Sequence, residues 1–203
     1  RLQRRLFTED AVRGFAFVDL CQKRYDVVLM NPPFGESIPA LRKSLAAEYP
    51  LSAQDLGMAF VDHGVRVLSE GGRVGALTSR TFLANDGMSD WRKVTLLGGV
   101  SRLTAFADLG YGVLDDAMVE AAAYVVALLH SDDTLVFHNL LSSTNKGGDL
   151  SSAVHCSPNA SVNVTQHLSL FARVPEHVLC YWLPAAFLNA TLSMPTISAD
   201  GAP

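Results

Sequence analysis

The chain of 203 residues has no long apolar run, no closely spaced cysteines and no excess of positive charge. Its longest unbroken apolar run, residues 121–129, is nine residues long, about half of the roughly 18 that a membrane-spanning helix needs. We therefore expect no membrane span and no membrane partner. The net charge of −4 gives no general attraction to a polyanion, so any contact with nucleic acid must be local or come from another part of the protein.

Cysteine is scarce, and the three residues, Cys21, Cys156 and Cys180, lie far apart. They form no Cys-x-x-Cys pair and have no histidine at ligand spacing, so we expect neither a disulfide framework nor a metal site. This indicates a reducing compartment and a cytoplasmic location. Hydrophobic residues make up 49% of the chain and charged residues 18%. That composition excludes intrinsic disorder and predicts a large core.

Residues 1–140 alternate between strand-like and helix-like segments. Residues 25–30 (YDVVLM) form a short apolar run that stops at Pro-Pro, which is typical of a buried parallel strand. The segments that follow are predicted in turn as helix, strand, helix and strand: residues 52–69, 73–78, 87–97 and 102–107. This alternation predicts an α/β fold with a parallel sheet and crossover helices.

The helix over residues 52–69 has recognisable start and stop signals. Ser52 followed by Asp55 resembles a capping box, and Gly71-Gly72 is typical of a helix end. We therefore expect the helix to begin at Ser52.

The pattern changes after residue 108. Two strands, 117–129 and 134–140, follow without a helix between them, which predicts an antiparallel hairpin at the sheet edge. Residues 141–170 are rich in Ser, Thr, Asn and Gly and are interpreted as an irregular linker. Residues 171–182 are expected to contain one short helix opened by Pro175.

The sequence Asn31-Pro32-Pro33-Phe34 stands directly after the strand 25–30, at the sheet edge where open α/β sheets bind ligands. Because the two prolines have no N–H and the residue before a proline is held extended, the turn offers directed acceptors without competing donors. The Asn31 side-chain oxygen and the Pro32 carbonyl can accept both hydrogens of one planar amino group, and Phe34 can stack on a flat base. The alternative is a Pro-Pro turn that only ends a strand.

This element resembles motif IV of the S-adenosylmethionine-dependent amino-methyltransferases, and residues 16–36 resemble the joined motifs III and IV of the N6-adenine DNA methyltransferases. The resemblance implies that Asp19, with Leu20 beside it, contacts the cofactor's adenine. Residues 107–129 resemble the motif VIII hairpin, where Leu114 takes the place of the aromatic that sandwiches the extruded base and Tyr111 could substitute for it. The sequence of these segments is most similar to that of the type IIG restriction and BREX phage-defence methyltransferases.

The resemblance implies the carboxyl half of a Rossmann-like methyltransferase sheet: a partial catalytic domain over 1–140 with motifs III to VIII, and a linker and the start of a DNA target-recognition region over 141–203. A Gly-rich loop for the cofactor and an acidic residue for its ribose would belong to an upstream part of the same protein. One flank of the strand 25–30 would then face nothing that this chain provides. The upstream part, S-adenosylmethionine and duplex DNA are the implied partners.

The implied function is methyl transfer to the N6 amine of a flipped adenine in restriction-modification or phage defence. Two alternatives remain open at this point. The same motif could act on a release-factor glutamine amide or an RNA guanine amine, or the chain could be a non-catalytic scaffold or DNA-binding fragment of a larger defence protein. Arg80, Arg92 and Lys93 are interpreted as solvated surface residues, with contact to DNA phosphates as the alternative.

Overall fold

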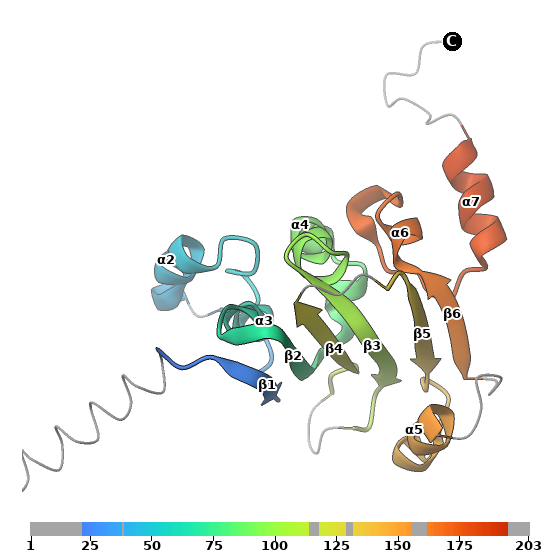
Figure 1. Ribbon diagram of the computed structural model, residues 1–203, viewed down its shortest axis with the longest axis horizontal. Helices are drawn as coiled ribbons and strands as arrows, with labels where there is room; N and C mark the ends of the chain where they lie inside the picture. The colour runs from blue at the N-terminus through green and yellow to red at the C-terminus, as the bar shows by residue number, and fades with distance from the viewer. Residues whose placement is uncertain (1–21, 38, 114–117, 129–131, 156–161, 195–203) are drawn as a thin grey trace, which may run out of the picture.

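The computed structural model describes residues 22–37, 39–113, 118–128, 132–155 and 162–194. These residues build a six-stranded mixed sheet in the order β1-β2-β4-β3-β5-β6 (Figure 1). The strands are β1 Tyr25–Met30, β2 Leu68–Ser79, β3 Ser101–Gly110, β4 Ala121–Leu128, β5 Thr134–Asn139 and β6 Asn163–His167. The α/β fold class is confirmed.

The helices are short, and several are a single turn. The α-helices are α2 Pro39–Glu48, α3 Leu56–Arg66, α4 Ser89–Trp91, α5 Lys146–His155, α6 Leu168–Phe171 and α7 Ala185–Ser193. Three 3-10 turns, η1 Arg80–Leu83, η2 Asp86–Met88 and η4 Pro175–His177, and the π-helical turn η3 Arg92–Leu96 complete the order. Within the described ranges, no helix has the length and apolar character to cross a bilayer.

The position of strand β4 differs from its predicted place at the sheet edge. It lies between β2 and β3 and pairs antiparallel with both, whereas β5 pairs parallel with β3. The predicted hairpin of two successive strands at the sheet edge is therefore wrong. Its sequence, AAAYVVAL, is apolar on both faces and five of its eight residues are buried, which is typical of a strand inside a sheet rather than at its edge. The antiparallel pair at the edge is formed instead by β5 and β6.

The helix α3 begins later than its sequence signals indicate. Its N-cap is Asp55, whose carboxylate accepts the backbone N–H of Met58 at 3.1 Å, so Ser52 is not the N-cap. Ser52 donates to Asp62 in the middle of the helix instead. The helix ends at Arg66 because β2 begins at Leu68, so the two glycines at 71 and 72 lie inside the strand.

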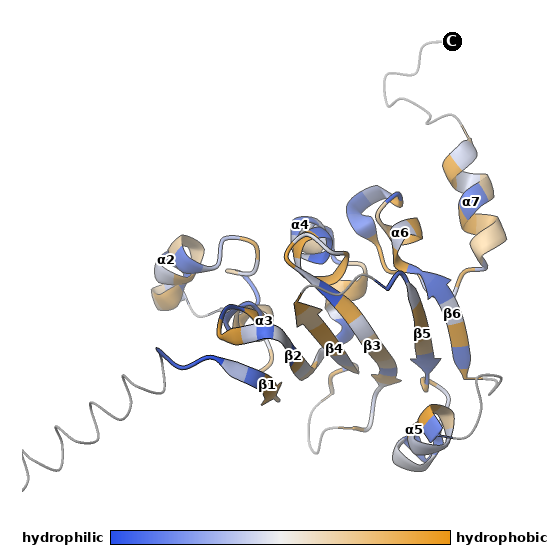
Figure 2. Ribbon diagram, viewed as in Figure 1, coloured by the Kyte–Doolittle hydropathy of each residue, from blue (hydrophilic) through white to orange (hydrophobic). Residues whose placement is uncertain are grey.

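Two further segments differ from their predicted conformation. Residues 87–97 were expected to form one helix, and residues 86–96 are helical without a gap, but the hydrogen bonding changes from 3-10 in η2 to α in α4 and π in η3. The interpretation of 141–170 as an irregular linker is wrong, because α5, β6 and the start of α6 lie there. Polar residues are tolerated in α5 and β6 because both elements lie at the edge of the sheet and have one side in solvent. Figure 2 shows β6 as largely hydrophilic. Pro175 opens η4 as predicted, but η4 is a single turn in which Glu176 and His177 have positive φ, so the expected short helix does not form there.

One face of the sheet carries the main core. Side chains of α3, the turns around Trp91 and α6 pack there against the strands, and the Tyr181 ring stacks on Phe137 with centroids 4.9 Å apart and planes 2° apart. Because β6, Phe171 and Tyr181 share this core, the sheet domain extends beyond residue 140. The start of a target-recognition region within 141–203 stays a prediction.

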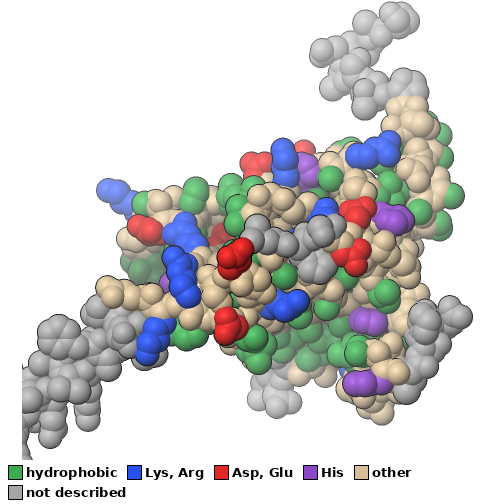
Figure 3. Space-filling view, viewed as in Figure 1, with side chains coloured by type: hydrophobic (Ala, Val, Ile, Leu, Met, Phe, Trp, Pro, Cys, Tyr) green, Lys and Arg blue, Asp and Glu red, His purple; other side chains and the backbone are tan. Residues whose placement is uncertain are grey.

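The opposite face is covered only in part. Helix α5 packs on it through Leu150, beside a small buried cluster of Ala107, Leu109 and Leu140. Among the described strands, β1 pairs only with β2, and its Val27 and Leu29 side chains are 59% and 79% exposed. Figure 3 shows hydrophobic side chains gathered on this side next to α5. Strand β1 is parallel as predicted, but it is an edge strand and not a buried one within the described part.

Candidate active site

The loop from Asn31 to Ser37 is held in place by the residues just before α3. The backbone N–H of Leu56 donates to the Gly35 carbonyl at 3.2 Å, and that of Ser37 donates to Gln54 at 3.1 Å. The Ser37 hydroxyl donates to the Ala53 carbonyl at 2.6 Å. These backbone contacts fix the loop without using the side chains of Asn31 or Phe34, which therefore remain free for another role.

The Pro-Pro turn packs closely on the first turn of α3. A Cβ added at Gly57 would lie 3.7 Å from the Pro33 carbonyl oxygen, 3.8 Å from a ring carbon of Pro32 and 3.2 Å from an Asp55 carboxylate oxygen. Pro32 is buried, whereas Asn31 and Pro33 are exposed. The turn is therefore anchored by Pro32 and presents Asn31 at the end of β1.

Asp55 combines a structural role with a position at the site. Burial raises the pKa of its carboxyl group, and the backbone N–H groups of Met58 and Gly57 act in the opposite direction. Asp55 caps α3 and also lines the polar cavity described next.

A cavity of about 760 Å³, here called the carboxyl-edge cavity, lies at the carboxyl ends of the parallel strands. The loop after β1 contributes Phe34, and the described start of the β3–β4 loop contributes Tyr111. Both aromatic residues expected to stack on a base therefore line the same cavity. The sequence interpretation missed the polar residues that line it: Glu36, Arg42, Gln54, Asp55, Ser79, Thr81, Asn85 and Glu120. The position of Ser79 at the carboxyl end of a parallel strand was the signal that could have identified it.

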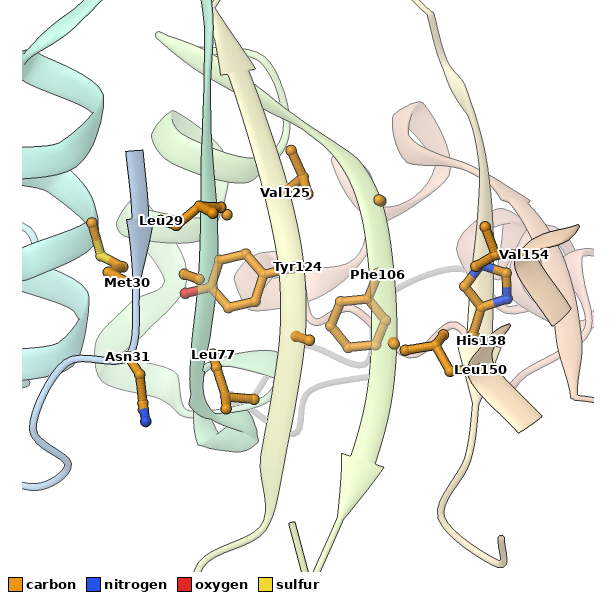
Figure 4. A pocket seen from close by; sticks show the side chains of 15 residues that line it. Leu29, Met30, Asn31, Leu77, Phe106, Tyr124, Val125, His138, Leu150 and Val154 are labelled. Atoms are coloured by element: carbon orange, nitrogen blue, oxygen red, sulfur yellow. The ribbon is translucent and has the colours of Figure 1, made fainter. Parts of the chain in front are cut away.

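Asn31 lines a different cavity, here called the sheet-face cavity. It has a volume of about 590 Å³ and lies on the partly covered face of the sheet, between β1 and α5. In Figure 4, Asn31 stands at the end of β1 beside Met30, and Leu77 projects from the neighbouring strand. Asn31 and Phe34 thus stand on two sides of one loop. Asp19, Leu20 and Leu114 lie outside the described residues.

The described residues do not by themselves fit the whole of S-adenosylmethionine. The cofactor carries a carboxylate, an ammonium and a sulfonium group, which require charged or hydrogen-bonding partners. The sheet-face cavity beside Asn31 is lined almost entirely by apolar residues and by His138. Tyr124 also lines it, but its hydroxyl contacts Thr78 and Met58 in the main core. A complete cofactor site therefore needs residues other than these.

The arginines behave differently from their interpretation as solvated surface residues. Arg92 is fully buried and donates to backbone carbonyls of Phe82, Asn85 and His177 at 2.7, 2.7 and 3.0 Å, so it cannot meet DNA phosphates. Arg80 pairs with the buried Asp108, with Nε 2.7 Å from Oδ1. Burial acts to lower the pKa of the Arg80 guanidinium, but hydrogen bonding to Asp108 and attraction by its charge raise it overall. Lys93 is exposed.

The described residues offer no candidate metal centre. No group of three or more His, Cys, Asp or Glu side chains is placed there to hold a metal ion. Cys180, the cysteine within the described ranges, is buried with a free thiol, and burial raises the pKa of that thiol.

The chain is similar to one curated protein and to several solved structures. It is 26% identical over 187 residues to the adenine-specific methyltransferase BrxX of Escherichia coli O9:H4 (strain HS), a match that covers 86% of this chain and 15% of the relative. The chain therefore spans only a small part of that relative's length.

Two solved structures share the fold. A modification subunit of a putative type I restriction enzyme from Vibrio vulnificus YJ016 matches with a TM-score of 0.57 and 16% identity, over 73% of this chain and 34% of its own. The type I restriction-modification methyltransferase subunit from Streptococcus thermophilus matches with a TM-score of 0.58 and 12% identity, over 77% of this chain and 37% of its own. The carboxyl-edge location of the Asn-Pro-Pro-Phe loop thus occurs in a methyltransferase-like sheet.

The family comparison covers more than half of the chain and includes this loop. Residues 3–108 match the sequence pattern of the Eco57I restriction-modification methylases. The chain belongs to the Eco57I restriction-modification methylase family.

Proposed function

We propose that the protein containing this chain transfers a methyl group from S-adenosylmethionine to the N6 amine of adenine in duplex DNA, as part of restriction-modification or phage defence. The observation that carries the proposal is the anchored Asn31-Pro32-Pro33-Phe34 loop at the carboxyl end of β1, which borders a cavity lined by Phe34 and Tyr111. The family match and the name of the Escherichia coli relative support the same substrate.

The residues of this chain act on the adenine amine. The amine lone pair is delocalised into the ring, which makes it a weak nucleophile. Acceptance of both N–H groups by the Asn31 side chain and the Pro32 carbonyl favours the pyramidal amine, whose lone pair is free to attack. Phe34 and Tyr111 provide faces for a flat base, and the role of Leu114 in this stacking stays a proposal. The adenine must leave the base stack to reach them.

The cofactor would supply only the methyl group, which passes directly to the amine without a covalent enzyme intermediate. Asp19 and Leu20 are proposed to contact the cofactor's adenine. We propose further that an upstream part of the same protein pairs with the free edge of β1, covers the exposed Leu29 and completes the cofactor site. Because DNA is the substrate and the chain's cysteines are far apart, we place the protein in the cytoplasm.

The alternatives are less well supported. A release-factor glutamine amide or an RNA guanine amine could use the same loop, but the family match and the adenine-specific name of the relative favour adenine in DNA. A non-catalytic scaffold does not require an exposed Asn31 in a loop whose Phe34 lines the carboxyl-edge cavity.

The test uses the intact parent protein and tritiated S-adenosylmethionine. Plasmid DNA, ribosomal RNA and a release factor are offered in parallel, and the methylated DNA is digested to identify N6-methyladenine by mass spectrometry. We expect label in DNA only. Asn31→Ala should reduce turnover by about 100-fold or more while cofactor affinity changes little.

Asn139→Ala is the matched control, because Asn139 also ends a parallel strand but its side chain accepts the backbone N–H of Leu141. We expect this variant to methylate DNA at close to the wild-type rate. Label in RNA or release factor, or wild-type turnover by Asn31→Ala, would contradict the proposal.

A further inference from the structure

Arg80 lies beside the carboxyl-edge cavity, between Ser79 and Thr81, which both line it. It follows directly after β2, and its guanidinium lies against the carboxylate of Asp108 near the end of β3: Nε is 2.7 Å from Oδ1, and Nη2 donates to Oδ2 at 2.7 Å. On its other side, Nη1 donates to Glu120 at 3.3 Å, and the Arg80 backbone N–H donates to the Glu120 carbonyl at 2.9 Å. One side chain therefore contacts the ends of both β3 and β4.

Asp108 and Glu120 bracket the β3–β4 loop. Asp108 lies three residues before Tyr111, and Glu120 directly precedes the first residue of β4. The described residues of this loop that line the carboxyl-edge cavity are Tyr111, Met118, Val119 and Glu120. The β3–β4 pairing joins the two ends of this loop at Gly110 and Ala121, and Arg80 adds a side-chain contact to each end, through Asp108 and Glu120.

The pair between Arg80 and Asp108 is well suited to this task. The Asp108 side chain is fully buried, and a buried carboxylate must keep its partners. Its Oδ2 also accepts the hydroxyl of Tyr181 at 2.7 Å, so the carboxylate is held from two sides. One hydrogen bond, from Arg80 Nη2 to Oδ2, and the short Nε–Oδ1 distance tie the guanidinium to this buried carboxylate, and a hydrogen bond between charged groups is stronger than one between neutral groups.

We propose that Arg80 is a positioning residue that holds both ends of the β3–β4 loop, so that Tyr111 stands against the extruded base in the carboxyl-edge cavity. This inference rests on the proposed function. Its consequence is specific: loss of Arg80 displaces the base from the reacting geometry more than it weakens DNA binding as a whole. Misplacement by about 1 Å can lower turnover by about 100-fold.

A second arginine pair provides the matched control. Arg102 lies near the start of β3, at the opposite edge of the sheet, with Nη2 3.4 Å from Oδ1 of Asp133. The Arg102 and Arg80 side chains are similarly exposed, at 17% and 20%. Replacing Arg102 removes an arginine of similar exposure that pairs with a carboxylate, without touching the loop; its partner Asp133 is 34% exposed, whereas Asp108 is buried.

The experiment compares Arg80→Ala with Arg102→Ala in the intact protein. For each variant we measure kcat and KM with plasmid DNA, the affinity for S-adenosylmethionine, and hydrogen exchange in the peptide that spans residues 109–121. For Arg80→Ala we expect kcat to fall by about 100-fold, KM and cofactor affinity to change by less than about threefold, and exchange in this peptide to increase. Arg102→Ala should keep wild-type kcat and exchange in this peptide.

Several outcomes would overturn the inference. Equal kcat losses in the two variants, or a loss confined to KM, would make Arg80 a general structural or DNA-binding residue. If Arg80→Ala does not fold, Glu120→Gln decides, since the Glu120 side chain is 37% exposed and the substitution weakens only the outer contact. Lowered kcat with faster loop exchange in that variant supports the inference, and wild-type values overturn it.

The exchange measurement also separates this inference from the proposed function. A wild-type protein that does not methylate DNA would refute the proposed function. Faster exchange of residues 109–121 in Arg80→Ala, but not in Arg102→Ala, would still support the loop-holding role of Arg80. Unchanged exchange would overturn it.

Discussion

Replacement of the buried Arg92 tests the structure most directly, because the sequence places this residue on the surface. The side chain is 0% exposed and donates to carbonyls from two distant segments: Phe82 and Asn85 on one side, Glu176 and His177 on the other. Glu176 and His177 adopt the left-handed conformation with φ of 53° and 54°, which costs a non-glycine residue about 1 kcal/mol or more. Arg92 therefore stabilises a strained turn.

The expected loss of stability in Arg92→Met follows from these contacts. In the variant, the Asn85 carbonyl still accepts the backbone N–H of Met88 at 3.0 Å. The carbonyls of Phe82, Glu176 and His177 lose the donor that Arg92 supplies, at about 1–2 kcal/mol each. Methionine fills much of the volume and avoids the burial of a charge, which returns about 2 kcal/mol. We expect a net loss of about 3 kcal/mol.

Urea unfolding of the chain, followed by tryptophan fluorescence at low protein concentration, measures this loss. Trp91 neighbours Arg92 and is 0% exposed, so its emission reports the relevant region. With a slope of about 2 kcal/mol per molar urea, the midpoint should fall by about 1.5 M. Arg73→Met, at an exposed position of β2, is the control and should change stability by less than about 0.5 kcal/mol. A change equally small in Arg92→Met would refute the buried network.

Three further predictions concern stacking, the Asp108 site and the sheet edge. Phe34→Trp should keep much more methylation activity than Phe34→Ala, because stacking needs only a flat face; equal losses in a kinetic assay would indicate core packing. Burial raises the pKa of the Tyr181 hydroxyl above its value in the unfolded chain. The neutral hydroxyl therefore stabilises the fold fully below about pH 10, and this contribution is lost as the pH rises further. Tyr181→Phe should lower the free energy of unfolding by about 1–2 kcal/mol at pH 7, and in urea titrations its stability should fall less steeply at alkaline pH than that of the wild type. The chain of 203 residues expressed alone should associate through the exposed edge of β1 and bind S-adenosylmethionine weakly, and a monomer in sedimentation with micromolar cofactor binding would contradict this.

Local sequence was sufficient where the neighbours in space are also neighbours in the chain. The strand 25–30, the Asn-Pro-Pro-Phe loop and most of α3 were predicted because apolar periodicity and proline act within a few residues. The N-cap was misplaced because Ser52 and Asp55 are both good caps, and only the contact with Asp62 occupies the Ser52 hydroxyl. The helix predicted over 87–97 is present from Asp86 to Leu96, but its hydrogen bonding changes from 3-10 through α to π around Trp91 and Arg92, and local propensity does not indicate such changes.

The sequence by itself determined that an acceptor-rich loop follows a parallel strand and that Phe34 and Tyr111 are candidate base contacts. Only the tertiary structure decided that both rings line one cavity and that β4 lies between β2 and β3. It also decided that Arg80 pairs with a buried carboxylate and that Arg92 is buried. Strand order and the burial of a charge depend on contacts between residues that are far apart in the sequence, such as the hydrogen bond between Tyr181 and Asp108. No pattern within a few residues records that pairing, because its partners are brought together only when the sheet forms.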